Sequence, residues 1–389
     1  MLNDLKVLEL ASVLAGPSVG QFFAEVGAEV IKVENIRTRG DVTRTWRVAD
    51  ETTDDRSAYF CSVNWGKKSI AVDLRQKEGQ DIVCKLALNS DIVISSYKSG
   101  DAEKLGVDFQ TLSSLNPRLI YGQISGFGAH NSRVGYDAVI QAEAGFMFMN
   151  GEAGGPSLKM PVALMDILAA HQLKEGLLLA LLERNQTGRG RYVHVSLFDA
   201  AVASLANQAT NWLVAGVIPQ KQGSLHPNIA PYGEIFRTAD GVEILLAVGS
   251  DRQFSAFAEI VGLGSEIISS YATNVQRVNY RDKLSATLQV KIEQLSSQLL
   301  IKSLQVAGVP YGLVRNSKEV FESAEAKALL LHSEDRTGIK TFVAGGLSVN
   351  VSHFLPPPHF GEHTFEILQK SLNFPTNLAK SLLDQGIVA

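Results

Sequence analysis

Short apolar runs alternate with helix-like segments over the first third of the chain, and this alternation constrains the fold more than any other feature. The runs typical of buried strands are residues 6–10, 29–34, 69–74, 91–96 and 119–125, and the helix-like segments between them include 18–26, 78–88 and 109–115. Strands that alternate with helices form a parallel sheet with helices on both faces. Right-handed crossovers then predict an α/β fold, a Rossmann-like, doubly wound parallel sheet.

The remaining sequence predicts a second, smaller domain. A hairpin is expected at 234–249, with its turn at Asp240–Gly241, and residues 251–310 are largely helical in pattern. A chain of 389 residues is long enough for two domains. We therefore expect a large Rossmann-like domain and a small α+β domain. The expected ranges are 1–205 with 320–389 for the large domain, 225–315 for the small one, and 205–225 and 315–320 for the linkers.

Composition excludes several classes of function. The chain is 45% hydrophobic and 20% charged with a formal net charge of -4, which gives no electrostatic basis for binding nucleic acid or an anionic membrane. The opening MLNDLKVLEL does not have the pattern of a signal peptide, and no apolar run is long enough to span a bilayer. Cys61 and Cys84 have neither metal nor redox spacing, and no metal-ligand cluster is visible. We expect a cytoplasmic protein without a metal.

Asp166 is the only fully charged residue of MPVALMDILAAHQL, residues 160–173, and it begins a long apolar segment that predicts a helix to about Asn185. One interpretation is a helix cap, because Asp is favoured at that position, although Ala169 stands where a capping box has Glu or Gln. The other is catalysis, because a carboxylate can act as a covalent nucleophile. The spacing alone leaves both open.

Other candidate residues are less specific. AGPSVG at 15–20 follows the first predicted strand, and it is either a tight turn between strand and helix or a turn whose backbone approaches a bound phosphate. It does not match GxGxxG, so a nicotinamide-dependent dehydrogenase is not expected. His226 could act as an acid or base, although a single loop histidine is more often structural. Basic residues near the predicted strands could pair with phosphates or be solvated: Lys32, Arg37, Arg39, Arg44, Lys67, Lys68, Lys98 and Lys104.

Seven segments, in order along the chain, together resemble the class III CoA-transferase family, also called the CaiB–BaiF family. They are VLAGPSVGQFFAEVGAEVIKVE (13–34), NWGKKSIAVDL (64–74), NPRLIYGQISGFG (116–128), GYDAVIQAEAG (135–145), TGRGRYVHVSLFDAAVA (187–203), HPNIAPYGEIFRTADG (226–241) and FGEHTFEIL (360–368). The resemblance implies that coenzyme A is a substrate, that acyl-CoA and a small carboxylic acid are the partners, and that no nicotinamide takes part. It also implies an interlocked homodimer.

The resemblance assigns expected roles to single residues. Asp166 matches the catalytic nucleophile that forms an aspartyl-CoA thioester, Asp137 matches a supporting acid, and Tyr136 lines the site. The expected CoA-binding residues are Leu14 and Ala15 near the pantetheine, Lys67 and Lys104 near phosphate, Arg133 near the thiol end, and Ser96 and Lys98, which replace the family's Asn and Arg.

The substrate and the alternatives follow from two further motifs. Residues 223–232 match a mobile loop that covers the acyl site, and HPNIAP resembles members that use succinyl-CoA or related dicarboxyl-CoA donors. The alternative on the same fold is an α-methylacyl-CoA racemase, but position 136, where racemases have a His, is Tyr. A non-catalytic CoA-binding protein would not need Asp166.

Overall fold

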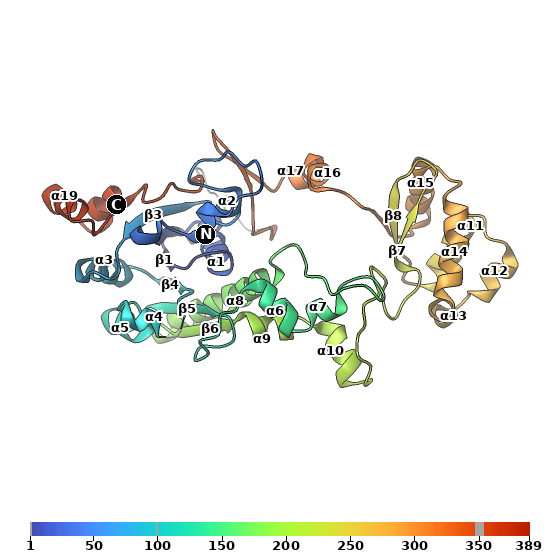
Figure 1. Ribbon diagram of the computed structural model, residues 1–389, viewed down its shortest axis with the longest axis horizontal. Coiled ribbons are helices and arrows are strands. Elements are labelled where there is room, and N and C mark those ends of the chain that lie inside the picture. Colours follow the sequence, from blue (N-terminus) through green and yellow to red (C-terminus); the bar gives the residue numbers. More distant parts are fainter. Residues whose placement is uncertain (1, 99, 347–353) are drawn as a thin grey trace. The chain divides into compact units, whose positions relative to one another are not determined.

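The computed structural model describes residues 2–98, 100–346 and 354–389, and the chain forms two compact units (Figure 1). The large unit comprises Met1–Phe146, Lys159–Gly216 and Ala328–Ala389, and the small unit comprises Met147–Leu158 and Val217–Lys327. The expected large domain included 147–158. The structure groups this segment with the small unit, where the Gly223 amide donates to the Gly151 carbonyl at 2.8 Å.

The large unit is built on six parallel strands. They are β1 (Lys6–Leu10), β2 (Glu29–Asn35), β3 (Lys67–Val72), β4 (Ile92–Ser95), β5 (Ile120–Ser125) and β6 (Tyr192–Ser196). Their order in the sheet is β3-β2-β1-β4-β5-β6, and every neighbouring pair is parallel. This order is that of doubly wound nucleotide-binding folds. The predicted α/β fold is confirmed.

Each face of the sheet carries its own apolar core, because successive side chains of a strand point to opposite faces. Val7 of β1 packs with α1 (Ala15–Glu25) and α8 (Leu164–Thr187) in one core. Leu8 packs in the other core, beneath α3 (Lys77–Leu88), α5 (Phe109–Leu115) and α19 (Thr376–Asp384). Figure 1 shows α8 running beside β5 and β6.

Shorter elements complete the large unit. The helices are η1 (Ile36–Thr38), η2 (Val42–Thr45), α2 (Ala58–Cys61), α4 (Asp101–Lys104), α6 (Asp137–Glu143), α7 (Phe146–Met149, reaching into the small unit), α9 (Leu197–Ala203), α10 (Ala206–Leu213), α18 (Thr364–Glu366) and η3 (Ile367–Ser371). Strands β10 (Leu330–His332) and β11 (Thr337–Ile339) form a separate antiparallel pair. Within the described ranges, no helix is both long and apolar enough to cross a membrane.

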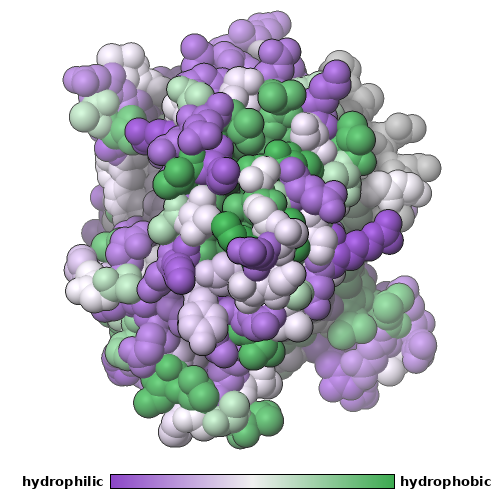
Figure 2. Space-filling model, turned by 90° about the vertical axis from the view of Figure 1, so that its right-hand side faces the viewer, coloured by the Kyte–Doolittle hydropathy of each residue, from purple (hydrophilic) through white to green (hydrophobic). Residues whose placement is uncertain are grey.

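The small unit has an antiparallel sheet of β7 (Tyr232–Arg237), β8 (Glu243–Ala247) and β9 (Tyr311–Leu313). Its helices are α11 (Asp251–Ile260), α12 (Ser265–Ser270), α13 (Asn274–Asn279), α14 (Arg281–Ile292), α15 (Ser297–Ala307), α16 (Ser317–Glu322) and α17 (Ala324–Lys327). The predicted hairpin is β7–β8. Figure 2 shows the side that carries α11 and α12, where hydrophilic side chains separate small groups of hydrophobic ones.

Helix α1 begins at Ala15, three residues before the expected start, so AGPSVG forms the opening turns of a helix rather than a loop. Its glycines permit close packing on β1. A Cβ atom on Gly16 would lie 2.4 Å from the Cβ of Ala11, and one on Gly20 would lie 1.8 Å from Glu9 Oε2. These glycines serve contact between helix and sheet, as the last glycine of dinucleotide-binding turns does.

Two leucines of α3 test this account of the core. Leu86 is 4% exposed beneath the sheet, and Leu88 is 52% exposed on the same helix. We expect Leu86→Ala to lower the free energy of unfolding by about 2–5 kcal/mol, because it leaves a cavity among fixed neighbours. Leu88→Ala should change it by less than about 0.5 kcal/mol. Urea denaturation followed by circular dichroism measures both, and equal losses would contradict the assignment.

Candidate active site

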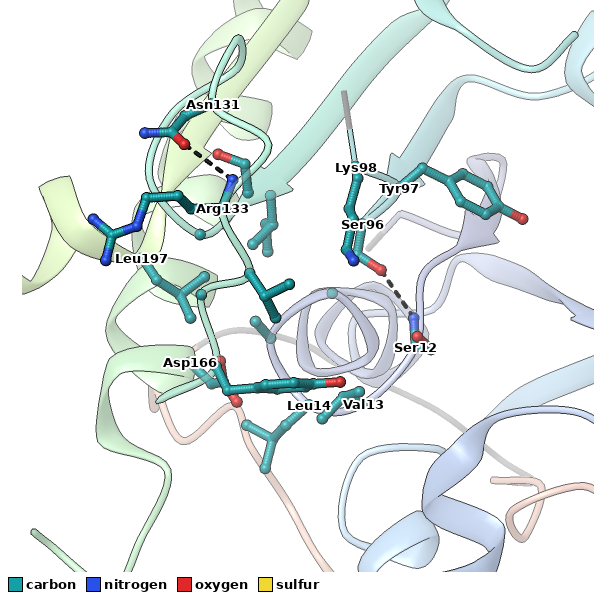
Figure 3. Close-up of a pocket in the computed structure, with 18 residues that line it drawn as sticks. Ser12, Val13, Leu14, Ser96, Tyr97, Lys98, Asn131, Arg133, Asp166 and Leu197 are labelled. Carbon is teal, nitrogen blue, oxygen red and sulfur yellow. Dashed lines mark hydrogen bonds between the residues drawn. The ribbon is translucent and has the colours of Figure 1, made fainter. Parts of the chain in front are cut away.

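A cavity of about 240 Å³ lies at the carboxyl edge of the parallel sheet (Figure 3). Its walls come from the segments that follow β1, β4 and β5, joined by Leu197 after β6 and by Asp166 of α8. The carboxyl ends of parallel strands meet at one edge of a sheet, and α/β folds bind ligands there. Most of the residues expected at the site line this cavity: Leu14, Ala15, Ser96, Lys98, Arg133, Tyr136 and Asp166.

Asp166 is not a helix cap. Helix α8 begins at Leu164, two residues before Asp166, and its N-cap residue is Ala163. The first-turn amide of Met165, which has no acceptor within its own helix, instead donates to Asp137 Oδ1 at 2.8 Å, so Asp137 of α6 caps α8 from outside. Gln141 also donates to Asp137, at 2.6 Å, and fixes its carboxylate. This arrangement leaves Asp166, 8% exposed, directed at the cavity rather than at its own helix.

Burial, and after it the nearby charge of Asp137, raise the pKa of Asp166 to about 7. A carboxylate held in weakly polar surroundings has few water molecules to displace before it attacks an electrophile. A pKa near neutrality still leaves a large fraction ionised at pH 7. Strongly perturbed acids in a cavity are typical of catalytic sites.

Two glycines shape the wall opposite α8. A Cβ atom on Gly126 would lie 2.6 Å from Gly135 Cα, so the segments GFG and GYD touch backbone to backbone. Arg133 lies between them, but its guanidinium pairs with Glu143 and stacks over Phe127, 4.1 Å from the ring centre. Figure 3 shows it pointing away from Asp166. Arg133 therefore contributes to the wall more than it contributes a free charge.

A second cavity, of about 530 Å³, lies beyond the ends of β2 and β3. Lys104 lines it and donates to Asp101 at 3.2 Å. Tyr97 lines both cavities, and burial raises the pKa of its hydroxyl to about 12, so the ring is neutral. Arg75 also borders this cavity. An elongated ligand with an anionic end could occupy both spaces.

Lys67 does not fit its expected role at a phosphate. Its side chain is fully buried, pairs with Glu9 at 2.8 Å and donates to the Pro17 carbonyl at 2.8 Å. It also donates to Asn64 Oδ1 at 2.9 Å. Burial lowers its pKa to about 8 against the opposing charge of Glu9. The sequence could not reveal this, because the acid that pairs with Lys67 lies 58 positions earlier, on another strand.

Sequence reasoning missed other residues at the site. Ser125 lines the cavity at the end of β5, and its Oγ lies 2.9 Å from Nε2 of His194 on the neighbouring β6. The Gly128 amide donates to the same Oγ at 3.0 Å. The available signal was a Ser at the end of one strand and a His within the next strand along the sheet. Tyr59 lies outside the set of residues that line the cavity, although the charges of the two acids act on it. Burial, followed by the charges of Asp166 and Asp137, raises its pKa to about 12.

The expected covering loop belongs to the small unit, where two helices hold its backbone. Asn274 Nδ2 donates to the Asn228 carbonyl at 2.9 Å, and Arg277 Nε donates to the Ala230 carbonyl at 2.7 Å. Arg281 donates to the His226 carbonyl at 2.7 Å. The His226 ring accepts a hydrogen bond from the Asn228 amide at 3.1 Å, so it serves the shape of this loop.

One group of possible metal ligands exists among the described residues: Asp54, Asp55 and His359, whose ligand atoms lie within 4.8 Å of one another. All three are exposed. Arg56 and Arg336 pair with Asp54, and Arg44 pairs with Asp55. Arginines therefore already balance the acids, and the group is an ion-pair cluster.

Comparison with known proteins places this geometry in a family. The model of CoA-transferase family III matches residues 2–364. A succinate–glutarate CoA-transferase from Agrobacterium fabrum is 35% identical, with 94% of each chain covered. The human succinyl-CoA:glutarate CoA-transferase is 32% identical over 100% of this chain and 90% of its own.

A solved structure agrees with these sequence matches. The crystal structure of a CaiB/BaiF family protein from Brucella suis superposes with a TM-score of 0.82 at 36% identity, covering 93% of this chain and 97% of the other. The chain therefore belongs to CoA-transferase family III, as its seven motifs predicted, and is an enzyme of that class.

Proposed function

We propose that this enzyme moves CoA from a dicarboxyl-CoA donor to a second carboxylic acid through a thioester between CoA and Asp166. The observation that carries the proposal is the state of Asp166, which is buried in a cavity at the carboxyl edge of the sheet with a pKa raised to about 7. The alternative role, capping α8, is performed by Asp137. Asp166 is thus available for covalent chemistry.

The first half of the reaction loads CoA onto the enzyme. The Asp166 carboxylate attacks the donor's thioester carbonyl, the carbon–sulfur bond breaks, and CoA leaves as a thiolate. The product is a mixed anhydride between the donor acyl group and Asp166. The thiolate then attacks the aspartyl carbonyl and expels the donor acid as its carboxylate. The enzyme now holds CoA as an aspartyl thioester.

The second half reverses these steps with a different acid. The acceptor carboxylate attacks the aspartyl thioester, which releases the thiolate and forms a new anhydride. The thiolate attacks the acceptor carbonyl, giving the new acyl-CoA and restoring the Asp166 carboxylate. Each bond broken is replaced by one of similar energy, so no ATP is needed.

The surroundings of Asp166 support both halves. Anhydride and thioester hydrolyse in water, and a buried position protects them. Ala15 and Gly16 line the same cavity in the first turn of α1, where backbone amides lack acceptors within the helix. The positive end of this helix favours the negative charge that develops on a carbonyl oxygen under attack.

CoA is an elongated molecule, and the two cavities together offer space for its two ends. We propose that the pantetheine and thiol lie in the cavity with Asp166, beside Leu14 and Ala15, and that the nucleotide end lies in the second cavity near Lys104. Tyr97, which borders both, would mark the passage between them. Ser96 and Lys98 lie beside Tyr97 in the first cavity.

The substrate class is supported by the relatives. The names of two proteins that match nearly end to end join succinate or succinyl-CoA with glutarate. Both acids carry two carboxylates. We propose a donor such as succinyl-CoA and an acceptor that is also a dicarboxylic acid.

We further propose that two copies of the chain form a homodimer, as the resemblance implies. The large unit leaves apolar side chains uncovered on two helices. Leu179 and Leu182 of α8 are 67% and 62% exposed, and Leu213, at the end of α10, is 75% exposed. Burial of such side chains is the main driving force of obligate association.

Trapping the intermediate tests the covalent role. Purified enzyme is incubated with succinyl-CoA, treated with hydroxylamine and examined by peptide mass spectrometry. We expect a hydroxamate at Asp166, and we expect Asp166→Ala to lose it together with at least about a thousandfold of transfer activity. Glu175→Ala, which removes an exposed acid from the same helix, should keep both.

Two other outcomes would reject the proposal. If no acyl-CoA yields an adduct but solvent deuterium enters the substrate's α-carbon, the enzyme is a racemase or isomerase. If neither signal appears, Asp166 is not a nucleophile.

The raised pKa of Asp166 predicts a pH dependence. Since only the ionised carboxylate attacks, kcat/KM should rise about tenfold per pH unit below pH 7 and level off above it. Asp137→Asn keeps an oxygen to accept from the Met165 amide but removes a negative charge, so the midpoint should fall. Initial rates from pH 5 to 9 measure both midpoints, and a midpoint unchanged in Asp137→Asn would contradict the electrostatic account.

The homodimer predicts a mass in solution of two chains. Light scattering coupled to size-exclusion chromatography should give that value for the wild type. Leu179→Glu combined with Leu182→Glu should give the mass of one chain or prevent soluble expression, because charges would enter an apolar interface. Glu175→Ala serves as the control. A wild type of single-chain mass would reject the homodimer.

A further inference from the structure

The connection between β1 and α1 is held at three consecutive backbone positions by side chains from β2 and from the segments that follow β2 and β4. The Ala11 carbonyl accepts from Lys32 Nζ at 2.7 Å. The Ser12 amide donates to Ser96 Oγ at 3.1 Å, drawn as a dashed line in Figure 3. The Val13 amide donates to both carboxylate oxygens of Asp41, each at 3.2 Å. Such a short segment has little freedom left.

Val13 adopts a backbone conformation that its residue type disfavours. Its φ is +73°, in the left-handed region, where the Cβ of an L-residue crowds the backbone. Branching at Cβ makes this region still less accessible to valine. A residue stays in such a conformation only when its surroundings determine it, and functional sites are where this occurs most often.

Asp41 is itself rigidly held. It is 5% exposed and pairs with Lys32 at 3.0 Å. Its Oδ1 accepts from the amide and the hydroxyl of Thr43 at 3.1 and 2.9 Å. Lys32 is 1% exposed and is fixed in turn by Glu9 at 2.9 Å. The carboxylate that anchors Val13 therefore cannot follow it if the segment moves.

The anchored segment forms part of the active-site wall. Val13 and Leu14 line the same cavity as Asp166, and Figure 3 draws all three. Asp41 and Lys32 lie behind the wall, outside the set of lining residues. They act on the cavity through the backbone that they hold.

We infer that Asp41, supported by Lys32, is a positioning residue that keeps Val13 in the left-handed conformation and so sets Leu14 and the first turn of α1 against Asp166. The inference rests on the proposed function, because it concerns the efficiency of attack by Asp166. Without the carboxylate, Val13 would return to a negative φ and Leu14 would be displaced. Displacements of about 1 Å in a catalytic wall can cost on the order of a hundredfold in rate.

Glycine at position 13 distinguishes positioning from a purely structural role. Glycine reaches positive φ without a steric penalty, so it needs no anchor to adopt the observed conformation. We expect Asp41→Ala to slow formation of the Asp166 adduct about a hundredfold. The double variant Asp41→Ala with Val13→Gly should recover about tenfold of that loss, a coupling that distant, independent sites do not show. Because glycine also relieves the strain of a positive φ in the folded state, thermal midpoints measured beside the rates separate recovery of the adduct rate from recovery of stability.

The experiment measures the rate of adduct formation with succinyl-CoA in the two Asp41 variants and in the wild type, with thermal midpoints for each. Asp91→Ala is the matched control. Like Asp41, Asp91 accepts a hydrogen bond from a backbone amide, that of Lys6 at 2.9 Å, and it pairs with the buried Arg184 at 3.0 Å. Unlike Asp41, it lies just before β4 and away from the cavity. This control should lose stability and keep the adduct rate of folded enzyme.

Asp41→Asn covers the case in which Asp41→Ala does not fold. It keeps one oxygen to accept from Val13 while weakening the pairing with Lys32, and it should give an intermediate rate. An adduct rate equal to that of the wild type in Asp41→Ala or in Asp41→Asn would overturn the inference. No recovery of the adduct rate in the double variant would overturn it as well.

A crystal structure of an Asp41 variant separates this inference from the proposed function. If the wild type forms no adduct, the proposed function fails, but φ at position 13 still tests the anchoring. A negative φ in Asp41→Ala supports it, and an unchanged φ near +73° overturns it.

Discussion

The large unit is organised around a buried network of charges centred on Glu9. Its carboxylate pairs with Lys32 of β2 and Lys67 of β3, and all three side chains are buried. Lys32 continues to Asp41. Removing one partner from such a network costs about 3–5 kcal/mol, because the other charge stays buried and unpaired. The packing of the large unit depends on this network of ion pairs, because it joins β1, β2 and β3 below α1. Position 20 is Gly, which lets α1 come close enough to cover the network.

Periodicity predicted the framework well because strands buried on both faces produce continuous apolar runs. The first five strands, the β7–β8 hairpin and α8 were all expected from local pattern, and the seven motifs predicted the family. Local pattern also placed most cavity residues at strand ends, where topology brings them together. Start positions were less accurate. Helix α1 begins inside a glycine-containing segment that is typical of a turn.

One wrong expectation and one open alternative share a cause, which is contact between residues distant in sequence. Lys67 was expected at a phosphate, and only its pairing with Glu9 reveals a structural role. Asp166 could have been a cap, and only the Asp137 carboxylate, 28 residues away from the Met165 amide that it accepts from, removes that possibility. Neither partner can be read from spacing along one helix or strand. The strained Val13 is likewise invisible, because valine gives no sign of a positive φ.

Residues near 387 pair with the end of β3, and this pairing has a consequence for how the chain folds during synthesis. The Asp73 amide donates to the Ile387 carbonyl at 2.9 Å, and Val72 bridges to Val388, so residues near 387 cover the end of β3. The small unit consists of Met147–Leu158 and Val217–Lys327, which leave the ribosome earlier. During translation the small unit can therefore be complete while β3 is still uncovered, and the nascent large unit must avoid aggregation until residues near 387 are released.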